Sequence, residues 1–261
     1  MALPAVVIEG VAFWSSRLPG WDVARAVIRG EAAAPDAAAP RPAPTLLAPT
    51  ERRRAPDTVA IALEVAARAC NAAQRSPAEL ASVFASTHGD LAISDYMCAT
   101  LVDTPTLISP VKFHNSVHNA AAGYWSIGTG SFATYTALSA FRHTFAAGLL
   151  EAVTQVACDG RPVLYVAFDI EAKGPLATIA PSKGLLGAAL VLAPCGAATA
   201  TRMRLRIDEQ PGATPANSPA AALIAQNALA PCLPFFEALA LQRPGLRLQL
   251  GERAGLDVTF D

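Results

Sequence analysis

The chain has 261 residues, of which 52% are hydrophobic and 16% charged, and its formal net charge is −1 at pH 7. This balance gives no electrostatic case for binding nucleic acid or an acidic membrane surface. No run approaches the roughly 18 apolar residues of a membrane span, and residues 1–14 lack the basic n-region of a signal peptide, so we expect a cytoplasmic protein.

The cysteines are expected to be unpaired, and the apolar content indicates a subunit interface. The five cysteines stand singly, without a C-x-x-C pair, at Cys70, Cys98, Cys158, Cys195 and Cys232. In a cytoplasmic setting we interpret them as small apolar side chains without disulfides. A chain this apolar, with a balanced charge, is expected to bury surface in a homodimer or a heterodimer.

The first part of the chain alternates short apolar runs with helical patterns. It predicts a strand over 5–8 that continues over 11–14 after a bend, a helix over 21–29, an Ala/Pro-rich loop over 31–50, a helix over 58–74, a strand over 83–86 and a helix over 93–101. The basic cluster Arg52-Arg53-Arg54 is interpreted as a solvated lead-in to a helix. His88-Gly89-Asp90 is interpreted as a strand-end turn, and an acid–base pair of His88 with Asp90 or Asp95 is the alternative.

Residues 106–158 form the central stretch. Its first half is rich in small and polar residues and is predicted to be a loop, and His114, His118 and His143 lie in or just after it. A strand over 132–136 is followed by a helix whose buried face carries apolar side chains three or four residues apart: Phe141, Phe145, Leu149, Val153 and Val156. Strand, sharp turn and buried helix form the layout of a nucleophile elbow.

The remaining segments complete an α/β pattern. They are a doubly buried strand over 163–168, a loop over 169–183, a buried strand over 187–192, a half-exposed strand over 202–207, a turn region over 210–218, a mainly helical segment over 219–241 and a hairpin over 246–250 and 256–260. This order predicts a layered domain with helices packed on a sheet.

Several motifs in the central stretch agree with one known family at fixed spacing. They are Ile108-Ser109-Pro110, then Asn119 with Ala122-Gly123, then Ser126-Ile127 with Thr129-Gly130, and last Thr136-Ala137. The stretch resembles the ketosynthases of the thiolase fold, which form carbon–carbon bonds in fatty-acid and polyketide synthesis. The resemblance covers most of residues 1–195.

The resemblance implies an α/β/α layered fold with a mixed sheet of about five strands. A small C-terminal helix and a β-hairpin are added to it. We therefore expect one domain over 1–261, in which a thiolase-like half (1–195) carries a C-terminal extension (196–261) packed on it.

The chain differs from the family at the positions of the catalytic cysteine and histidines. The position of the nucleophilic cysteine falls on Leu138, or on Ser139 in a register shifted by one. A thiolate accepts the acyl chain, and leucine cannot. No histidine follows His143, and the last 60 or so residues do not resemble the family's second half. Independent catalysis is therefore not expected, and neither a cofactor nor a metal is implied.

Residues 115–127 (NSVHNAAAGYWSI) and 145–152 (FAAGLLEA) are similar to a narrower group. This group comprises the short ketosynthase-like subunits of aryl-polyene and xanthomonadin-type pigment clusters. The resemblance implies a role like that of a chain-length factor, which pairs with a catalytic ketosynthase, shapes the acyl tunnel and meets the acyl carrier protein through the complex.

The residues predicted to line the tunnel or the interface are Phe113, His114, His118, Asn119, Tyr124, Trp125, Phe141 and His143. The bulky members are candidates for the tunnel wall, because a packed pocket is sensitive to changes in volume. His114 and His118 would suit a metal if they were helical, but a third ligand is missing, so we interpret them as hydrogen-bonded loop residues at an interface.

Two other functions stay open at this point. One is a thioesterase or acyltransferase that acts alone, with Ser139 as nucleophile and His143 or His118 as base. The other is a homodimeric scaffold that docks an acyl carrier protein.

Overall fold

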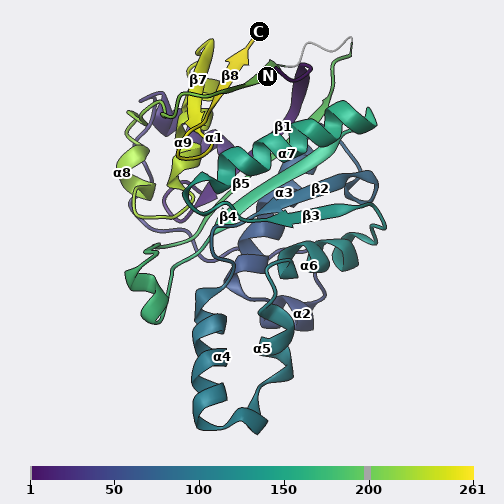
Figure 1. The fold of residues 1–261 in the computed structure, drawn as a ribbon, viewed down its shortest axis with the longest axis vertical. Helices are drawn as coiled ribbons and strands as arrows, with labels where there is room; N and C mark the ends of the chain where they lie inside the picture. The colour runs from purple at the N-terminus through teal and green to yellow at the C-terminus, as the bar shows by residue number, and fades with distance from the viewer. Residues whose placement is uncertain (1, 197–200) are drawn as a thin grey trace.

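One mixed sheet of eight strands runs through the computed structural model, which describes residues 2–196 and 201–261. The strand order across the sheet is β3-β2-β4-β5-β1-β6-β8-β7 (Figure 1). The strands are β1 (Val6–Ser15), β2 (Ala81–Ala85), β3 (Tyr135–Leu138), β4 (Val163–Asp169), β5 (Leu186–Pro194), β6 (Thr201–Asp208), β7 (Gly245–Gln249) and β8 (Gly255–Phe260). β3, β2 and β4 are parallel, and every other neighbouring pair is antiparallel.

The expected sheet of about five strands is present as β3-β2-β4-β5-β1, but the strand number was too low. The C-terminal hairpin was predicted as a separate addition, whereas β6 pairs with β1 and carries β8 and β7 into the same sheet. This pairing satisfies backbone groups of β1 that would otherwise form an open edge.

Helices cover both faces of the sheet. The main ones are α1 (Trp21–Ile28), α3 (Asp57–Ala73), α6 (Ala120–Thr129), α7 (Thr144–Asp159) and α9 (Leu233–Ala240). In Figure 1, α7 crosses in front of the sheet and α3 lies behind it. The shorter elements are α2 (Pro49–Arg54), α4 (Leu91–Asp103), α5 (Pro110–Asn115), α8 (Ala221–Ile224) and the 3-10 turns η1 (Pro77–Glu79), η2 (Pro105–Leu107), η3 (Phe141–His143), η4 (Pro175–Thr178) and η5 (Ala230–Cys232).

The core is divided by the sheet into two clusters, and β4 contributes to both. Its residues Val163, Tyr165 and Ala167 pack with α7, α1 and α9, while Leu164, Val166 and Phe168 pack with α3 and α6. Alternate side chains of a strand point to opposite faces, so a continuous apolar run is buried on both. The doubly buried strand predicted here is confirmed.

β1 is one strand with a bulge, as the bend between its two predicted halves suggested. The register shifts between Ile8 and Gly10. Because the bulge adds one residue to the strand, Ile8 and Phe13 both reach the α7 side although they are an odd number of residues apart.

The predicted loop over the first half of the central stretch is wrong, because α5 and α6 occupy it. Pro110 begins α5, where a missing N–H costs nothing, and the Ser109 hydroxyl accepts from Lys112 N at the same end. Gly130 ends α6 in the left-handed conformation, with φ of 66°. These local helix signals outweigh the polar composition.

The elements on either side of the elbow are also displaced from their predicted positions. β3 begins at Tyr135, and Phe132 is fully exposed at 102%. Phe141 precedes α7, which begins at Thr144, so Phe141 does not belong to the buried helix face as predicted.

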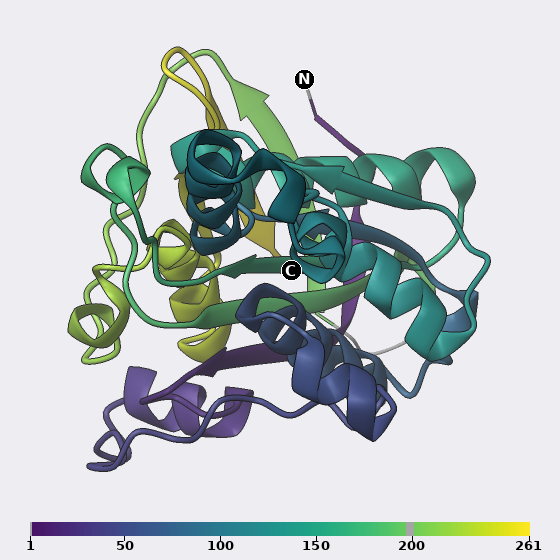
Figure 2. The same cartoon turned by 90° about the horizontal axis from the view of Figure 1, so that it is seen from below.

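α4 and α5 project together from the body of the molecule (Figure 1), and in the view from below they stand in front of the sheet (Figure 2). Only Leu91 and Ile93 of α4 are buried. None of the helices in the described ranges has the length and apolar character needed to span a membrane.

Candidate functional site

The turn between β3 and α7, residues 138–143, is called the elbow here. Phe141 has φ of 50°, an uncommon conformation for a bulky residue. The Thr144 hydroxyl braces the turn, because it donates to the Phe141 backbone oxygen (2.7 Å) and accepts from Ala140 N (3.0 Å). The strand–turn–helix layout predicted from sequence is therefore present, with its strained residue at Phe141.

The elbow presents no thiol. Leu138 is half-buried against the core on the α7 side, and Ser139 is exposed. The Ser139 hydroxyl donates to the backbone oxygen of Thr87 (2.9 Å), and within the described residues no histidine accepts this proton. The Ser139 hydroxyl is thus held by backbone and not by the imidazole that a serine nucleophile needs.

Ser86 and Thr87, directly after β2, connect the parts of the site. Their two successive backbone oxygens hold two of the predicted site residues: Thr87 accepts from Ser139, and Ser86 contacts His118 Nε2 at 2.9 Å. The two residues therefore link the elbow to the turn between α5 and α6.

Asp169, at the end of β4, holds Ser86 and Thr87 in place through hydrogen bonds. Its Oδ1 accepts from the Ser86 hydroxyl (2.9 Å) and from Thr87 N (2.9 Å). The side chain is 1% exposed, and burial raises the pKa of the carboxyl above its usual value. Sequence reasoning missed Asp169, although a polar residue directly after a doubly buried parallel strand is a recognisable signal.

The α5–α6 turn carries His118 and Asn119 beside the edge strand. Asn119 Nδ2 donates to the Tyr135 hydroxyl of β3 (3.0 Å). His114 lies on α5, and its ring packs edge-to-face with the Tyr124 ring, with 5.9 Å between the ring centroids. Since α5 ends at Asn115, His114 and His118 are not on one helix, and no group of three potential metal ligands occurs in residues 2–196 and 201–261.

The remaining predicted residues divide between surface and core. Phe113 is 62% exposed on α5 and Phe141 is 48% exposed at the elbow, whereas Tyr124 and Trp125 are buried in the cluster beside α3. His143 is half-buried and follows Phe141 in η3. The structure thus brings together His118, Asn119 and the elbow, and separates Tyr124 and Trp125 from them.

His88 and Asp90 have different surroundings. Asp90 caps α4 by accepting from Ile93 N (3.0 Å), and burial raises the pKa of its carboxyl. The His88 ring faces the Phe141 ring, with 6.5 Å between ring centroids. This is the strand-end turn favoured by the sequence, with the elbow packed against it.

Comparisons with known proteins agree with this geometry. The family model described as "Beta-ketoacyl synthase, N-terminal domain" matches residues 27–253. No curated protein matches the chain.

Among solved structures, the chain is similar to "Ketosynthase (ApeO) in Complex with its Chain Length Factor (ApeC) from Xenorhabdus doucetiae". The TM-score is 0.76 and the identity 20%, over 98% of this chain and 99% of that chain. A second is described as AntDE:AntF, a type II PKS acyl-carrier protein in complex with its ketosynthase; its TM-score is 0.72 and its identity 10%, over 98% and 99% of the two chains. The ishigamide ketosynthase/chain length factor gives 0.60 and 16%, over 78% and 68%. These likenesses show that the fold is that of the thiolase-like ketosynthases.

Proposed function

The chain belongs to the beta-ketoacyl synthase N-terminal domain family, and from this premise we propose that it is a non-catalytic, chain-length-factor-like subunit that pairs with a catalytic ketosynthase. The observation that carries the proposal is the elbow, where Leu138, Ser139 and Phe141 stand and none of the five cysteines lies. In the ketosynthases that the sequence resembles, a cysteine thiolate takes the acyl chain from a thioester. The acyl-accepting step therefore belongs to the partner.

The surface that would meet the partner is called the partner face. It consists of the outer edge of β3 and five exposed side chains near it in the chain: Phe113, Val117, Phe132, Tyr135 and Phe141. A strand edge that pairs with no other strand of the described residues is a template for pairing with another chain, and exposed large apolar side chains mark interaction surfaces. The position of this face beside the elbow supports the proposal that the chain is a subunit that binds a ketosynthase partner.

The pair would extend an acyl chain carried as a thioester on an acyl carrier protein in type II polyketide synthesis, and in aryl-polyene pigment synthesis in particular. The similar AntDE:AntF structure contains, by its description, a carrier protein with its ketosynthase. The pigment assignment comes from the resemblance of residues 115–127 and 145–152. We expect this chain to meet the carrier protein through the complex and to work in the cytoplasm.

Co-purification with the ketosynthase of the same biosynthetic cluster tests the proposal. We expect a one-to-one complex by native mass spectrometry, with full-length product made only by the pair. The double variant Phe132→Glu/Tyr135→Glu places two charges on the partner face and should weaken pairing at least tenfold, which is about 1.4 kcal/mol.

Leu241→Glu is the matched control, because Leu241 is also partly exposed (36%) but lies after α9 in the extension. It should pair like the unaltered chain. A stable homodimer that does not bind the ketosynthase would contradict the proposal, as would a ketosynthase that makes full-length product alone at the normal rate.

A further inference from the structure

A cavity of about 400 Å³ lies outside the carboxyl ends of the parallel strands β2 and β4. Ile170 directly follows β4 and lines the cavity, and so does Asp90, which lies between β2 and α4. Ligands of open α/β sheets bind in the crevice at the carboxyl ends of the strands. Because ligand pockets measure roughly 300–1,000 Å³, the cavity has the position and the size of a small-molecule site.

The inner part of the cavity is apolar but contains one polar atom without a partner. Ile93 of α4 and Ile170 are buried, and Leu185, just before β5, is half-buried. Asn115, the last residue of α5, lines the cavity and is 4% exposed, yet its Oδ1 has no hydrogen-bond partner within residues 2–196 and 201–261. An unpaired buried acceptor costs free energy, and a donor on a ligand would remove this cost.

Asp90 supplies a second acceptor to the cavity. Its Oδ1 accepts from Ile93 N (3.0 Å), and its carboxylate forms no ion pair in the described part of the chain. Burial raises the pKa of this carboxyl, and the Lys112 ammonium acts on it in the opposite direction. A buried amide oxygen and a carboxylate lining one cavity suit an ammonium group, which has three N–H donors and no acceptor.

The rim of the same cavity carries an excess of unpaired positive charge. Three exposed cations line it, and among the described residues none of them forms an ion pair: Arg54, Lys112 and Lys173. Of the two exposed acids at the rim, Asp57 is paired with Arg41, which leaves Glu171. The cations can hold a carboxylate of a ligand near the opening, where both ligand and protein charges stay partly in water.

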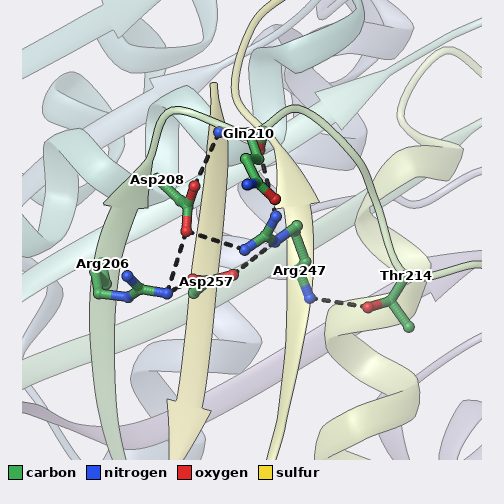
Figure 3. Close-up of polar contacts among 6 residues, drawn as sticks. All are labelled: Arg206, Asp208, Gln210, Thr214, Arg247 and Asp257. Atoms are coloured by element: carbon green, nitrogen blue, oxygen red, sulfur yellow. Dashed lines mark hydrogen bonds and ion pairs between the residues drawn. The ribbon is translucent and has the colours of Figure 1, made fainter. Parts of the chain in front are cut away.

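A second group of charges, on β6, β8 and β7, differs in that it neutralises itself. Arg206 and Arg247 each pair with both Asp208 and Asp257, as Figure 3 shows. Each of these four side chains therefore already has a partner of opposite charge. The cavity, in contrast, has unpaired groups of both signs around an apolar interior, and these are complementary to a molecule that itself carries both signs.

We propose that this cavity binds a zwitterionic small molecule, namely an α-amino acid with an apolar side chain. Its ammonium donates to Asn115 Oδ1 and to the Asp90 carboxylate, its carboxylate faces the cations of the rim, and its side chain lies on Ile93 and Ile170. A ligand without a donor would leave Asn115 Oδ1 unpaired. The inference goes beyond the proposed function, and it does not depend on pairing with a ketosynthase.

The first test measures the binding of L-phenylalanine to the full-length protein by isothermal titration calorimetry. Two matched probes each lack one charged group: 3-phenylpropionate has no ammonium, and phenethylamine has no carboxylate. We expect one-to-one binding of L-phenylalanine and at least tenfold weaker binding of both analogues, because each leaves one set of charged or polar groups in the cavity without a partner. Equal affinity for the three probes, or no saturable binding of L-phenylalanine, would overturn the inference.

The second test removes the two sets of groups from the protein. Asn115→Leu deletes the unpaired acceptor at similar volume and should weaken L-phenylalanine binding at least tenfold. Lys112→Met deletes an exposed cation of the rim and should weaken it about threefold, since exposed charge pairs contribute little. Lys183→Met is the matched control: Lys183 is also exposed but does not line the cavity, and its variant should bind like the unaltered protein.

Lys112→Met keeps the test valid if Asn115→Leu fails to fold, because Lys112 is on the surface. Binding by Lys112→Met that equals binding by Lys183→Met would contradict the proposed site. Hydrogen exchange then locates the ligand: saturating L-phenylalanine should slow exchange of the amides of residues 90–93 and 112–115 and leave β6 and β8 unchanged. Slower exchange only outside residues 90–93 and 112–115 would also overturn the inference.

Discussion

Asp169 shows how one buried carboxyl organises the site. It positions Ser86 and Thr87, whose backbone oxygens in turn hold His118 and Ser139. Its Oδ2 is buried without a hydrogen-bond partner in the described part of the chain. Burial of a charge without full compensation is costly, which is why the pKa of this carboxyl is raised.

The raised pKa of Asp169 predicts a pH-dependent stability. Between the usual aspartate pKa of about 3.9 and the raised native value, the folded state holds a proton that the unfolded state has released. The contribution of the residue to the free energy of unfolding is therefore largest below about pH 3.9 and falls as the pH rises through this window. Asp169→Asn keeps the Oδ1 acceptor and does not titrate.

Urea unfolding of both proteins between about pH 4 and about pH 8 measures this effect. The free energy of unfolding of Asp169→Asn minus that of the unaltered chain should increase with pH and level off above the native pKa. A difference that does not change with pH would show that Asp169 has the same pKa in both states.

Helix α7 packs on the sheet through a glycine. A Cβ at Gly148 would lie 2.6 Å from Tyr165 Cε2 and 3.0 Å from Ala85 Cβ, so the helix lies close to β4 and β2. Tyr165 is fully buried, and its hydroxyl donates to the Phe145 oxygen at 2.7 Å. This contact sets the height of α7, and with it the elbow, above the sheet.

Gly148→Ala should therefore lower the free energy of unfolding by about 1–3 kcal/mol, because overpacking forces the helix or Tyr165 to move. Gly123→Ala is the matched control on α6, where an added Cβ meets nothing within 4 Å. It should raise stability by up to about 1 kcal/mol through helix propensity. Chemical denaturation measures both, and equal effects at the two positions would contradict the close approach of α7.

At the scale of the whole molecule, the N-terminal part and the extension share one core. Phe236 of α9 meets Phe13 of β1 at 5.0 Å and Trp21 of α1 at 5.7 Å between ring centroids. The shared cluster also contains Met203 and Val258 from the extension and Leu149 from α7. A common core with a continuous sheet predicts that the two parts unfold together.

Phe236→Ala should lower the free energy of unfolding by about 3–5 kcal/mol through the cavity it leaves. Hydrogen exchange should show β4 and β8 losing protection to the same extent. The control Phe132→Ala removes a fully exposed ring and should change stability by less than about 0.5 kcal/mol. Loss of protection in β8 alone would show that the extension unfolds independently.

Local patterns predicted much of the fold. The apolar run over 163–168 predicted β4 and its burial on two faces, because a strand can bury every side chain only between two layers. The alternation over 246–260 predicted the hairpin. The motifs from Ile108 to Ala137 predicted the family, which the match over residues 27–253 then showed. The prediction gave the polar composition of 106–131 more weight than the local helix signals, Pro110 at the start of α5 and Gly130 at the end of α6, and the structure follows those signals.

By itself, the sequence determined the doubly buried strand over 163–168, the family and the lack of a cysteine at the elbow, since these depend on composition and on short spacings along the chain. The tertiary structure alone decided the joining of β6 to β1, the contact of Asp169 with Ser86 and Thr87, the strained turn at Phe141, and the cavity at the carboxyl ends of β2 and β4. Each of these depends on residues that are distant in the chain or on a backbone angle that packing imposes, and no pattern of neighbouring residues encodes them.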